Sequence, residues 1–146
     1  MASAPLAPLL IGSCEPFSGK SAVALGLARQ LSQRGVPISF GKPLATVVEE
    51  AGGGAAPLLD ADVRFVGEIL RLPGDQLLPS LHVQQASSAH QRLIGGDLSP
   101  GDAFAALQQR LSQQEGRLVL LEAAGTLSEG LLFGLGLVQM ARALQA

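Results

Sequence analysis

The chain has 146 residues, enough for one domain with a buried core, and 47% of them are hydrophobic whereas 3% are aromatic. A net charge of −2, with Lys and Arg scattered and no Trp or Tyr, argues against a nucleic-acid-binding surface. The single cysteine excludes an internal disulfide, and the apolar runs are too short to cross a membrane, so we expect a cytoplasmic protein.

Strand and helix patterns alternate from the start of the chain. The apolar residues 8–12 predict a short buried strand. Apolar residues then recur every fourth position, which predicts a helix over residues 19–34 that stops at a glycine. Residues 36–43 predict a second strand.

The middle of the chain is less regular. Residues 44–60 contain three consecutive glycines and are expected to form a loop. An apolar stripe predicts a second helix over residues 60–72. Residues 75–98 show no clear period, and we expect a loop with a short helix around residues 87–93.

The last third returns to a clear alternation. A Ser-Pro pair opens a predicted helix over residues 99–111, residues 117–125 predict a strand, and residues 128–146 predict an apolar helix. Strand and helix thus alternate three times. We therefore predict a single α/β domain over residues 1–146, with a parallel sheet of three or four strands between helices on both faces.

The tetrapeptide Ser18-Gly19-Lys20-Ser21 lies between the first predicted strand and the first predicted helix. Backbone N–H groups at a helix start attract anions, and the helix dipole adds partial positive charge there. Lys20 would contact terminal phosphates and the Ser21 hydroxyl would bind Mg²⁺. The alternative is an ordinary helix cap of the same sequence. The residues predicted to bind the nucleotide are Glu15, Pro16, Phe17, Ser18, Gly19, Lys20, Ser21 and Ala22.

Two further charged residues follow predicted strands. Glu122 ends the apolar run LVLL, and Lys42 follows the second predicted strand in the sequence FGKPL. Because parallel strands end at one edge of a sheet, we expect both side chains near Lys20. There Glu122 would suit Mg²⁺, and Lys42 would neutralise a phosphate or a substrate carboxylate. Alternatively, each is a surface charge at a strand end.

Four stretches, GSCEPFSGKSAVALGLARQLSQRG, FGKPLA, DADVRFV and VLLEAAGTLSEG, resemble the dethiobiotin synthetase-like family of P-loop NTPases. Within it they are similar to the branch found as the N-terminal domain of some phosphate acetyltransferases and in cyanobacterial relatives. That branch shares the EP-x-SGKS loop. Cys14 in place of the usual glycine is therefore typical of the branch. The resemblance covers nearly the whole chain and is weakest over residues 75–98.

The resemblance implies a three-layer α/β/α P-loop fold that binds ATP and Mg²⁺. It makes Lys20 and Lys42 the catalytic residues, in contact with phosphate and substrate. It makes Ser21, Asp62 and Glu122 the metal-side residues, with Asp60 as a rival to Asp62 two positions away.

The chain departs from the family in two respects. The synthetases have Gly directly after the metal-binding Glu, whereas this chain has Ala123, whose Cβ we expect to crowd a substrate. Family members also continue for several strands beyond the position of Ala146. We therefore expect the N-terminal part of a longer domain, in which residues 8–12 form a sheet edge that a second copy or a partner covers.

These observations favour an ATP·Mg²⁺-binding regulatory or sensory domain. The alternatives are an ATP-dependent carboxylase or ligase of the dethiobiotin synthetase type and a degenerate domain that serves only in assembly. A partition-type ATPase is a further alternative, but such proteins carry an extra lysine where this chain has Gly12, Ser13 and Cys14.

Overall fold

The computed structural model describes residues 7–45, 59–83, 91, 94–96 and 100–146. Most of the loop predicted over residues 44–60, and most of the short helix predicted around residues 87–93, lie outside them.

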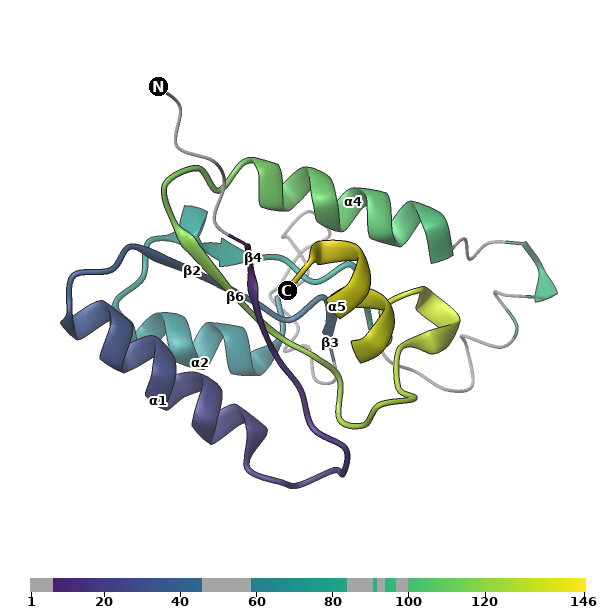
Figure 1. The fold of residues 1–146 in the computed structure, drawn as a ribbon, viewed down its shortest axis with the longest axis horizontal. Helices are drawn as coiled ribbons and strands as arrows, with labels where there is room; N and C mark the ends of the chain where they lie inside the picture. Colours follow the sequence, from purple (N-terminus) through teal and green to yellow (C-terminus); the bar gives the residue numbers. More distant parts are fainter. Residues whose placement is uncertain (1–6, 46–58, 84–90, 92–93, 97–99) are drawn as a thin grey trace, which may run out of the picture.

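A four-stranded parallel sheet forms the centre of the fold, in the strand order β1-β6-β2-β4 (Figure 1). A second, two-stranded parallel sheet joins β3 to β5. The predicted α/β class with a small parallel sheet is thus confirmed. The strands are β1 (Leu9–Ile11), β2 (Ile38–Gly41), β3 (Leu44–Ala45), β4 (Leu77–Leu78), β5 (His82–Val83) and β6 (Leu118–Glu122).

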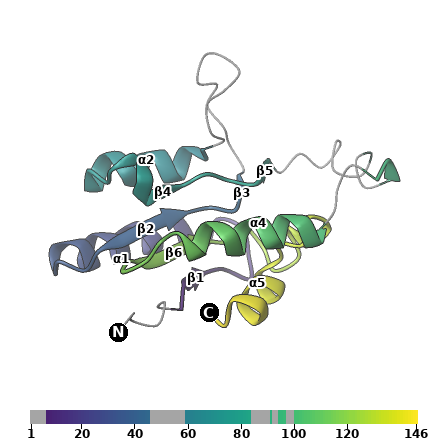
Figure 2. The same ribbon diagram turned by 90° about the horizontal axis from the view of Figure 1, so that it is seen from above.

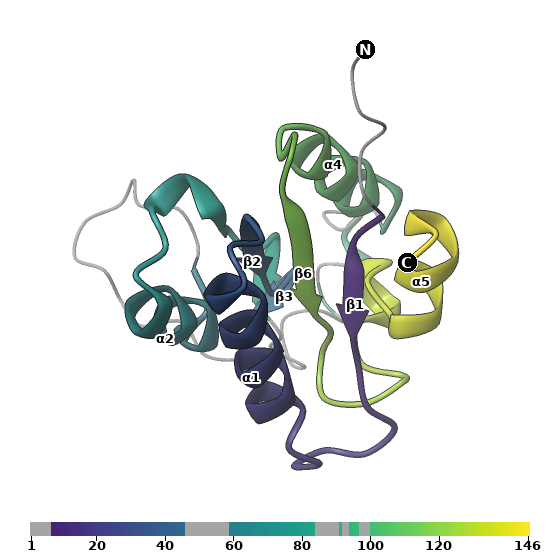
Figure 3. The same cartoon turned by 60° about the vertical axis from the view of Figure 1, so that its left-hand side comes forward.

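Helices pack on the two faces of the larger sheet (Figures 1 and 3). Within the described part of the chain, none of them is both long and apolar enough to cross a membrane. The α-helices are α1 (Lys20–Gln33), α2 (Ala61–Leu70), α4 (Pro100–Ser112) and α5 (Leu137–Leu144), and the short 3₁₀ turns are η1 (Gly74–Gln76) and η2 (Leu131–Phe133).

Successive side chains of each strand enter two different cores, because strand residues alternate between the faces of a sheet. Ile38, Phe40 and Leu120 join α1 and α2 in one core, which we name the α1/α2 core. Val119 and Leu121 join α4 and α5 in the other, the α4/α5 core. This alternation also sets the direction of the polar residues that follow each strand.

Local sequence explains where α1 and α2 begin. Gly19 caps α1 with a φ of 81°, a left-handed conformation that glycine adopts without steric cost. Asp60 caps α2, because its side chain accepts a hydrogen bond of 2.8 Å from the Asp62 amide. Of the two aspartates that can cap this helix, Asp60 does so.

The structure corrects three predicted elements. The helix over residues 128–146 is wrong in its first half, since Gly130 and Gly134 adopt φ values of 88° and 70°, and α5 begins only at Leu137. The expected loop contains β3, and the irregular stretch 75–98 contains β4 and β5. Two-residue strands are too short to show a period in the sequence.

The strand β1 lies at one end of the larger sheet, beside β6 (Figure 3). Ile11 is in register with Glu122, which places the start of the loop next to the end of β6. Viewed from above, β1 and α5 lie at one end of the molecule, and β4 and α2 lie at the other (Figure 2). The strand that carries Glu122 is thus the neighbour of the strand that precedes the loop.

Candidate functional site

The strand alternation directs two charged residues to the same face of the sheet. Glu122 follows Leu120 by two positions, and Lys42 follows Phe40 by two positions. Leu120 and Phe40 both belong to the α1/α2 core, so Glu122 and Lys42 continue on the side that carries α1 and α2. The predicted convergence of Lys20, Lys42 and Glu122 therefore has a simple geometric cause.

The first group of charges joins the start of α1 to the end of β6, and we name it the Lys20 cluster. Lys20 Nζ lies 2.6 Å from Glu122 Oε1. The Ser21 hydroxyl donates to the same oxygen over 2.7 Å. The Glu122 side chain is 1% exposed and that of Lys20 is 10% exposed, so the carboxylate is the buried member of the pair.

The second group, the Lys42 cluster, joins the end of β2 to the start of α2. Lys42 Nζ lies 2.6 Å from Asp62 Oδ2 and 3.4 Å from Asp60 Oδ1. Here the lysine is buried, with a side chain 4% exposed, while the Asp62 side chain is 43% exposed. Ser80 also fixes the backbone at this point, since its hydroxyl donates to the Lys42 carbonyl over 2.6 Å.

These neighbours change the pKa of Lys42. Burial is the largest single influence and lowers this pKa, because the ammonium group loses hydration. The hydrogen bond to Asp62 and the charges of Asp60, Asp62 and Glu122 act in the opposite direction and together outweigh burial. The pKa of Lys42 is therefore raised above its ordinary value of 10.5, and the side chain is a permanent cation at neutral pH.

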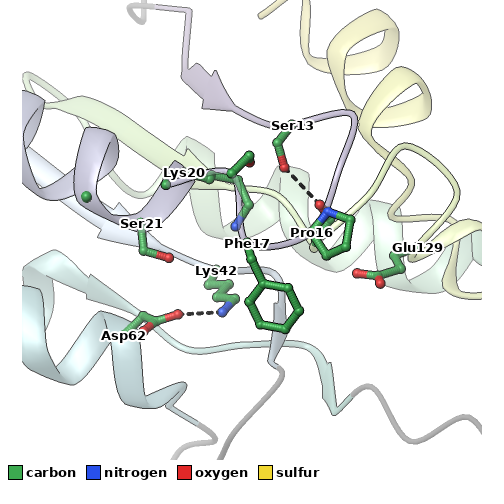
Figure 4. Close-up of a pocket in the computed structure, with 12 residues that line it drawn as sticks. Ser13, Pro16, Phe17, Lys20, Ser21, Lys42, Asp62 and Glu129 are labelled. Carbon is green, nitrogen blue, oxygen red and sulfur yellow. Dashed lines mark hydrogen bonds and ion pairs between the residues drawn. The ribbon is translucent and has the colours of Figure 1, made fainter.

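A cavity of about 720 Å³, the main pocket, opens above both clusters (Figure 4). Its lining includes both lysines, which come from α1 and from the end of β2, and Asp62 from α2. Of the residues predicted to bind a nucleotide, Glu15 is the one that does not line this pocket. The lining residues are Ser13, Pro16, Phe17, Ser18, Gly19, Lys20, Ser21, Ala22, Lys42, Asp62, Gly125 and Glu129.

The loop backbone offers hydrogen-bond donors at this pocket. Val23 N donates to Gly19 O over 3.0 Å and closes the first turn of α1. In the part of the chain that the structure describes, the amides of Lys20, Ser21 and Ala22 donate to no backbone carbonyl. The first amides of a helix have no partner within the helix, so these groups are available to an anion.

A smaller cavity of about 260 Å³, the side pocket, lies between α1 and α2. Ser21, Asp62 and Glu122, the three residues predicted on the metal side, all line it. Within the described ranges, no three His, Cys, Asp or Glu side chains are grouped closely enough to hold a metal by themselves. A hydroxyl and carboxylates suit Mg²⁺ when waters and phosphate oxygens complete the shell, as this ion usually requires.

The two aspartates at the start of α2 divide their roles. Asp60 is buried and caps the helix, whereas Asp62 is partly exposed and lines both pockets. Asp62 is therefore the acid that a bound ligand would meet. Asp60 instead caps the helix and contacts Lys42 from the buried side of the site.

Three residues that line the main pocket, Ser13, Gly125 and Glu129, were not predicted as site residues from the sequence. Ser13 bridges the loop to the segment after β6, since its hydroxyl lies 2.8 Å from the Gly125 carbonyl oxygen and 3.0 Å from that of Glu15. Gly125 packs so closely that an added Cβ would lie 2.6 Å from Glu129 Oε2. Gly125 was visible within the motif LLEAAG, but nothing in the spacing marked Ser13 or Glu129 as pocket residues.

Ala123 does not crowd the site as expected. It follows Leu121 by two positions and packs with it in the α4/α5 core, on the opposite face of the sheet. It is not among the residues that line the main pocket. The structure therefore gives no support to the expected crowding of a substrate by the Ala123 Cβ.

Both lysines of the chain lie in this site. The sequence contains ten Lys and Arg residues in all, of which only Lys20 and Lys42 are lysines. They come from different elements and are separated by 22 positions, yet they line one pocket. Neither is a solvated surface charge, since the Lys20 side chain is 10% exposed and that of Lys42 is 4% exposed.

A scan against protein-family models finds no match to this chain, and a search of curated proteins finds no significant relative. The family resemblance thus depends on the motifs quoted above.

Proposed function

We propose that this protein binds Mg²⁺·ATP, with the phosphates at the loop of residues 13–22. The observation that carries the proposal is the convergence of Lys20, Lys42 and Glu122, from three separate elements, at one edge of a parallel sheet. Ligands of open α/β sheets bind at this edge, outside the carboxyl ends of the strands. The unpartnered amides at the start of α1 support an anionic ligand there.

The charges of the two clusters match the two charges of a metal–nucleotide complex. The buried Glu122 requires a cation beside it, which is Lys20 in this structure. The buried Lys42 requires an anion beside it, here Asp62 with Asp60. The more exposed member of each pair can be replaced by part of the ligand. A metal ion can take the place of Lys20 beside Glu122, and a phosphate can take the place of Asp62 beside Lys42.

Ser21, Asp62 and Glu122 would hold the cation, directly or through water. They fit Mg²⁺ because all three offer oxygen atoms and line one small cavity. A bound Mg²⁺ would neutralise phosphate charge. Lys20 would then be directed to the terminal phosphates, and Lys42 would stay as a fixed positive charge at the wall of the pocket.

We propose that this binding serves a regulatory or sensory role. A second candidate is an ATP-dependent carboxylase or ligase of the dethiobiotin synthetase type. The position of Ala123 favours it, because that side chain leaves the main pocket clear for a second substrate. In such an enzyme both lysines would stabilise the charge that develops on the transferred phosphoryl group.

Titration calorimetry tests the proposal. We expect the wild-type protein to bind Mg²⁺·ATP or Mg²⁺·ADP, and Lys20→Ala to lose this binding. Arg29→Ala is the matched control, because Arg29 is an exposed cation on the same helix that does not line the pocket. A folded wild type that binds neither nucleotide would contradict the proposal and favour a role in assembly alone. ATP turnover that requires a diamine and bicarbonate would favour the ligase.

We also propose that a second copy or another protein covers β1, and that the protein is cytoplasmic. β1 ends the described sheet and Leu9 is partly exposed, so its backbone edge is open to strand pairing. The lone, exposed Cys14 suits a reducing compartment. Light scattering checks the first point, and a monomer at high protein concentration would contradict it.

A further inference from the structure

Another cavity, of about 660 Å³, shares no lining residue with the main pocket or the side pocket, and we name it the arginine pocket. It lies around β4, the strand at the opposite end of the larger sheet from β1. Arg110, in the last turn of α4, and Arg117, directly before β6, both line it. The function proposed above makes no use of this cavity.

The two arginines differ in their partners, and Arg117 is the one that is neutralised. Its Nη2 lies 2.7 Å from Asp75 Oδ2, and its Nη1 lies 3.3 Å from Gln114 Oε1. The same Gln114 oxygen accepts the hydroxyl of the buried Ser39 over 2.6 Å. Arg117 is therefore a fixed part of the wall, with an acid of its own beside it.

Arg110 has no such acid. In the part of the chain that the structure describes, no carboxylate lies within ion-pair distance of its guanidinium group. Its Nη1 donates to the Pro79 carbonyl oxygen, just after β4, and the guanidinium keeps further N–H donors for a ligand. Burial lowers the pKa of Arg110, because the partly buried cation loses hydration. An anion in the cavity would offset that loss.

The charges of the lining indicate which kind of anion fits. Two acids, Asp75 and Glu115, line the same cavity, and Arg117 balances the first of them. A group with two or more negative charges would be repelled by both carboxylates, whereas a single negative charge is enough for Arg110. The planar fork of a guanidinium matches a carboxylate, and the Gln113 side chain adds hydrogen-bonding groups to the lining. The volume is in the range of small-molecule sites.

We propose that the arginine pocket binds a small polar molecule that carries one carboxylate group, with this carboxylate on Arg110. The inference does not rest on nucleotide binding, because the two sites share no lining residue. The alternative is that Arg110 only complements the negative end of the α4 dipole and the Pro79 carbonyl. That alternative predicts no ligand.

NMR titration of the ¹⁵N-labelled protein with gluconate tests the inference. Gluconate is a monocarboxylate whose hydroxyl groups suit the polar lining. We expect saturable shifts of the amides in η1 and in residues 113–117, at constant ionic strength and mildly alkaline pH. Glucose, which lacks the carboxylate, and inorganic phosphate, a dianion at this pH, should each bind at least about tenfold more weakly.

Arg110→Gln should weaken gluconate binding by about tenfold or more, the equivalent of one charge-assisted hydrogen bond. Arg142→Gln is the matched control, because Arg142 is an exposed cation in the last turn of α5 and lines none of the cavities described above. It should keep the wild-type affinity. Lys20→Ala should keep it too, since Lys20 belongs to the main pocket.

Four results would each overturn the inference. They are the absence of saturable shifts with gluconate, shifts confined to the loop of residues 13–22, equal or tighter binding of glucose or phosphate, and an unchanged affinity in Arg110→Gln. None of them bears on the binding of Mg²⁺·ATP, so the proposed function stands or falls separately.

Arginine modification gives a readout that needs no variant, should Arg110→Gln fail to fold. Phenylglyoxal reacts with guanidinium groups, and mass spectrometry of the digested protein follows each arginine separately. Saturating gluconate should slow the modification of Arg110 by about threefold or more and leave that of Arg142 unchanged. Equal rates at Arg110 with and without gluconate would overturn the inference.

Discussion

The Lys20 cluster and the Lys42 cluster are opposite in design. In the first, the acid Glu122 is buried and its lysine lies nearer the pocket; in the second, the lysine is buried and its acid Asp62 reaches solvent. The Lys20 cluster contains one acid and one lysine, whereas the Lys42 cluster contains two acids and one lysine. The difference teaches that the buried charge is the acid in one cluster and the lysine in the other.

The largest expected effect separates the two lysines by function. Lys20→Ala should weaken Mg²⁺·ATP binding by about 100-fold or more, because it removes an ammonium group at the start of α1 that can donate charge-assisted hydrogen bonds to phosphate. Lys42→Ala should cost about tenfold, as a fixed charge at the pocket wall. Calorimetry measures both. Equal losses of affinity in the two variants would contradict different roles for the two lysines.

The effects on stability should follow the reverse order, with the larger loss for a substitution in the Lys42 cluster than for one in the Lys20 cluster. Lys42→Met should lower the free energy of unfolding by about 3 kcal/mol, because it removes the buried cation that lies 3.4 Å from the buried Asp60 carboxylate. Glu122→Gln should cost less than about 1.5 kcal/mol, because it keeps a hydrogen-bond acceptor and Lys20 can extend into the main pocket. Urea denaturation gives both values. A larger loss for Glu122→Gln would contradict the assignment of Lys42 as the structural charge.

The cap of α2 offers a finer test of the Lys42 cluster. Asp60→Ala removes both the charge and the acceptor for the Asp62 amide, whereas Asp60→Asn removes the charge and keeps an acceptor. The alanine variant should therefore be less stable by about 1 kcal/mol than the asparagine variant. Equal stability in thermal or urea unfolding would show that the cap contributes nothing beyond the charge.

The smallest effect is a pH dependence specific to Lys42. Its pKa is raised in the folded protein, so its contribution to stability is complete below the ordinary value of 10.5 and is lost as pH rises through the raised value. The stability difference between the wild type and Lys42→Met should be constant at neutral pH and shrink in strong alkali. The chain has no tyrosine to titrate in that range. A stability difference between the two proteins that grows as pH rises would contradict a raised pKa of Lys42.

The sequence predicted most of the elements that build the site, because these have strong local signals. The apolar run before the loop, the four-residue period of α1 and the acid at the end of β6 place Lys20 and Glu122 by themselves. Alternation along β6 and β2 then brings Glu122 and Lys42 to the same face. The same alternation places Ala123 on the opposite face, with Leu121.

Other features depend on tertiary contacts and left no local signal. The two-residue strands β3, β4 and β5 exist because neighbouring strands align them. The bridge from Ser13 to Gly125 joins residues 112 positions apart. The choice of Asp60 as cap and Asp62 as pocket acid needed the burial of one and the exposure of the other.

Phe17 is fully exposed at the mouth of the main pocket, with a positive φ of 55° that few non-glycine residues adopt. Its ring covers no core, so the position tolerates another large aromatic group. Since the protein has neither Trp nor Tyr, Phe17→Trp would give it a single strong fluorophore. Its emission would come from the loop alone and would follow events at the pocket mouth without background from the rest of the fold.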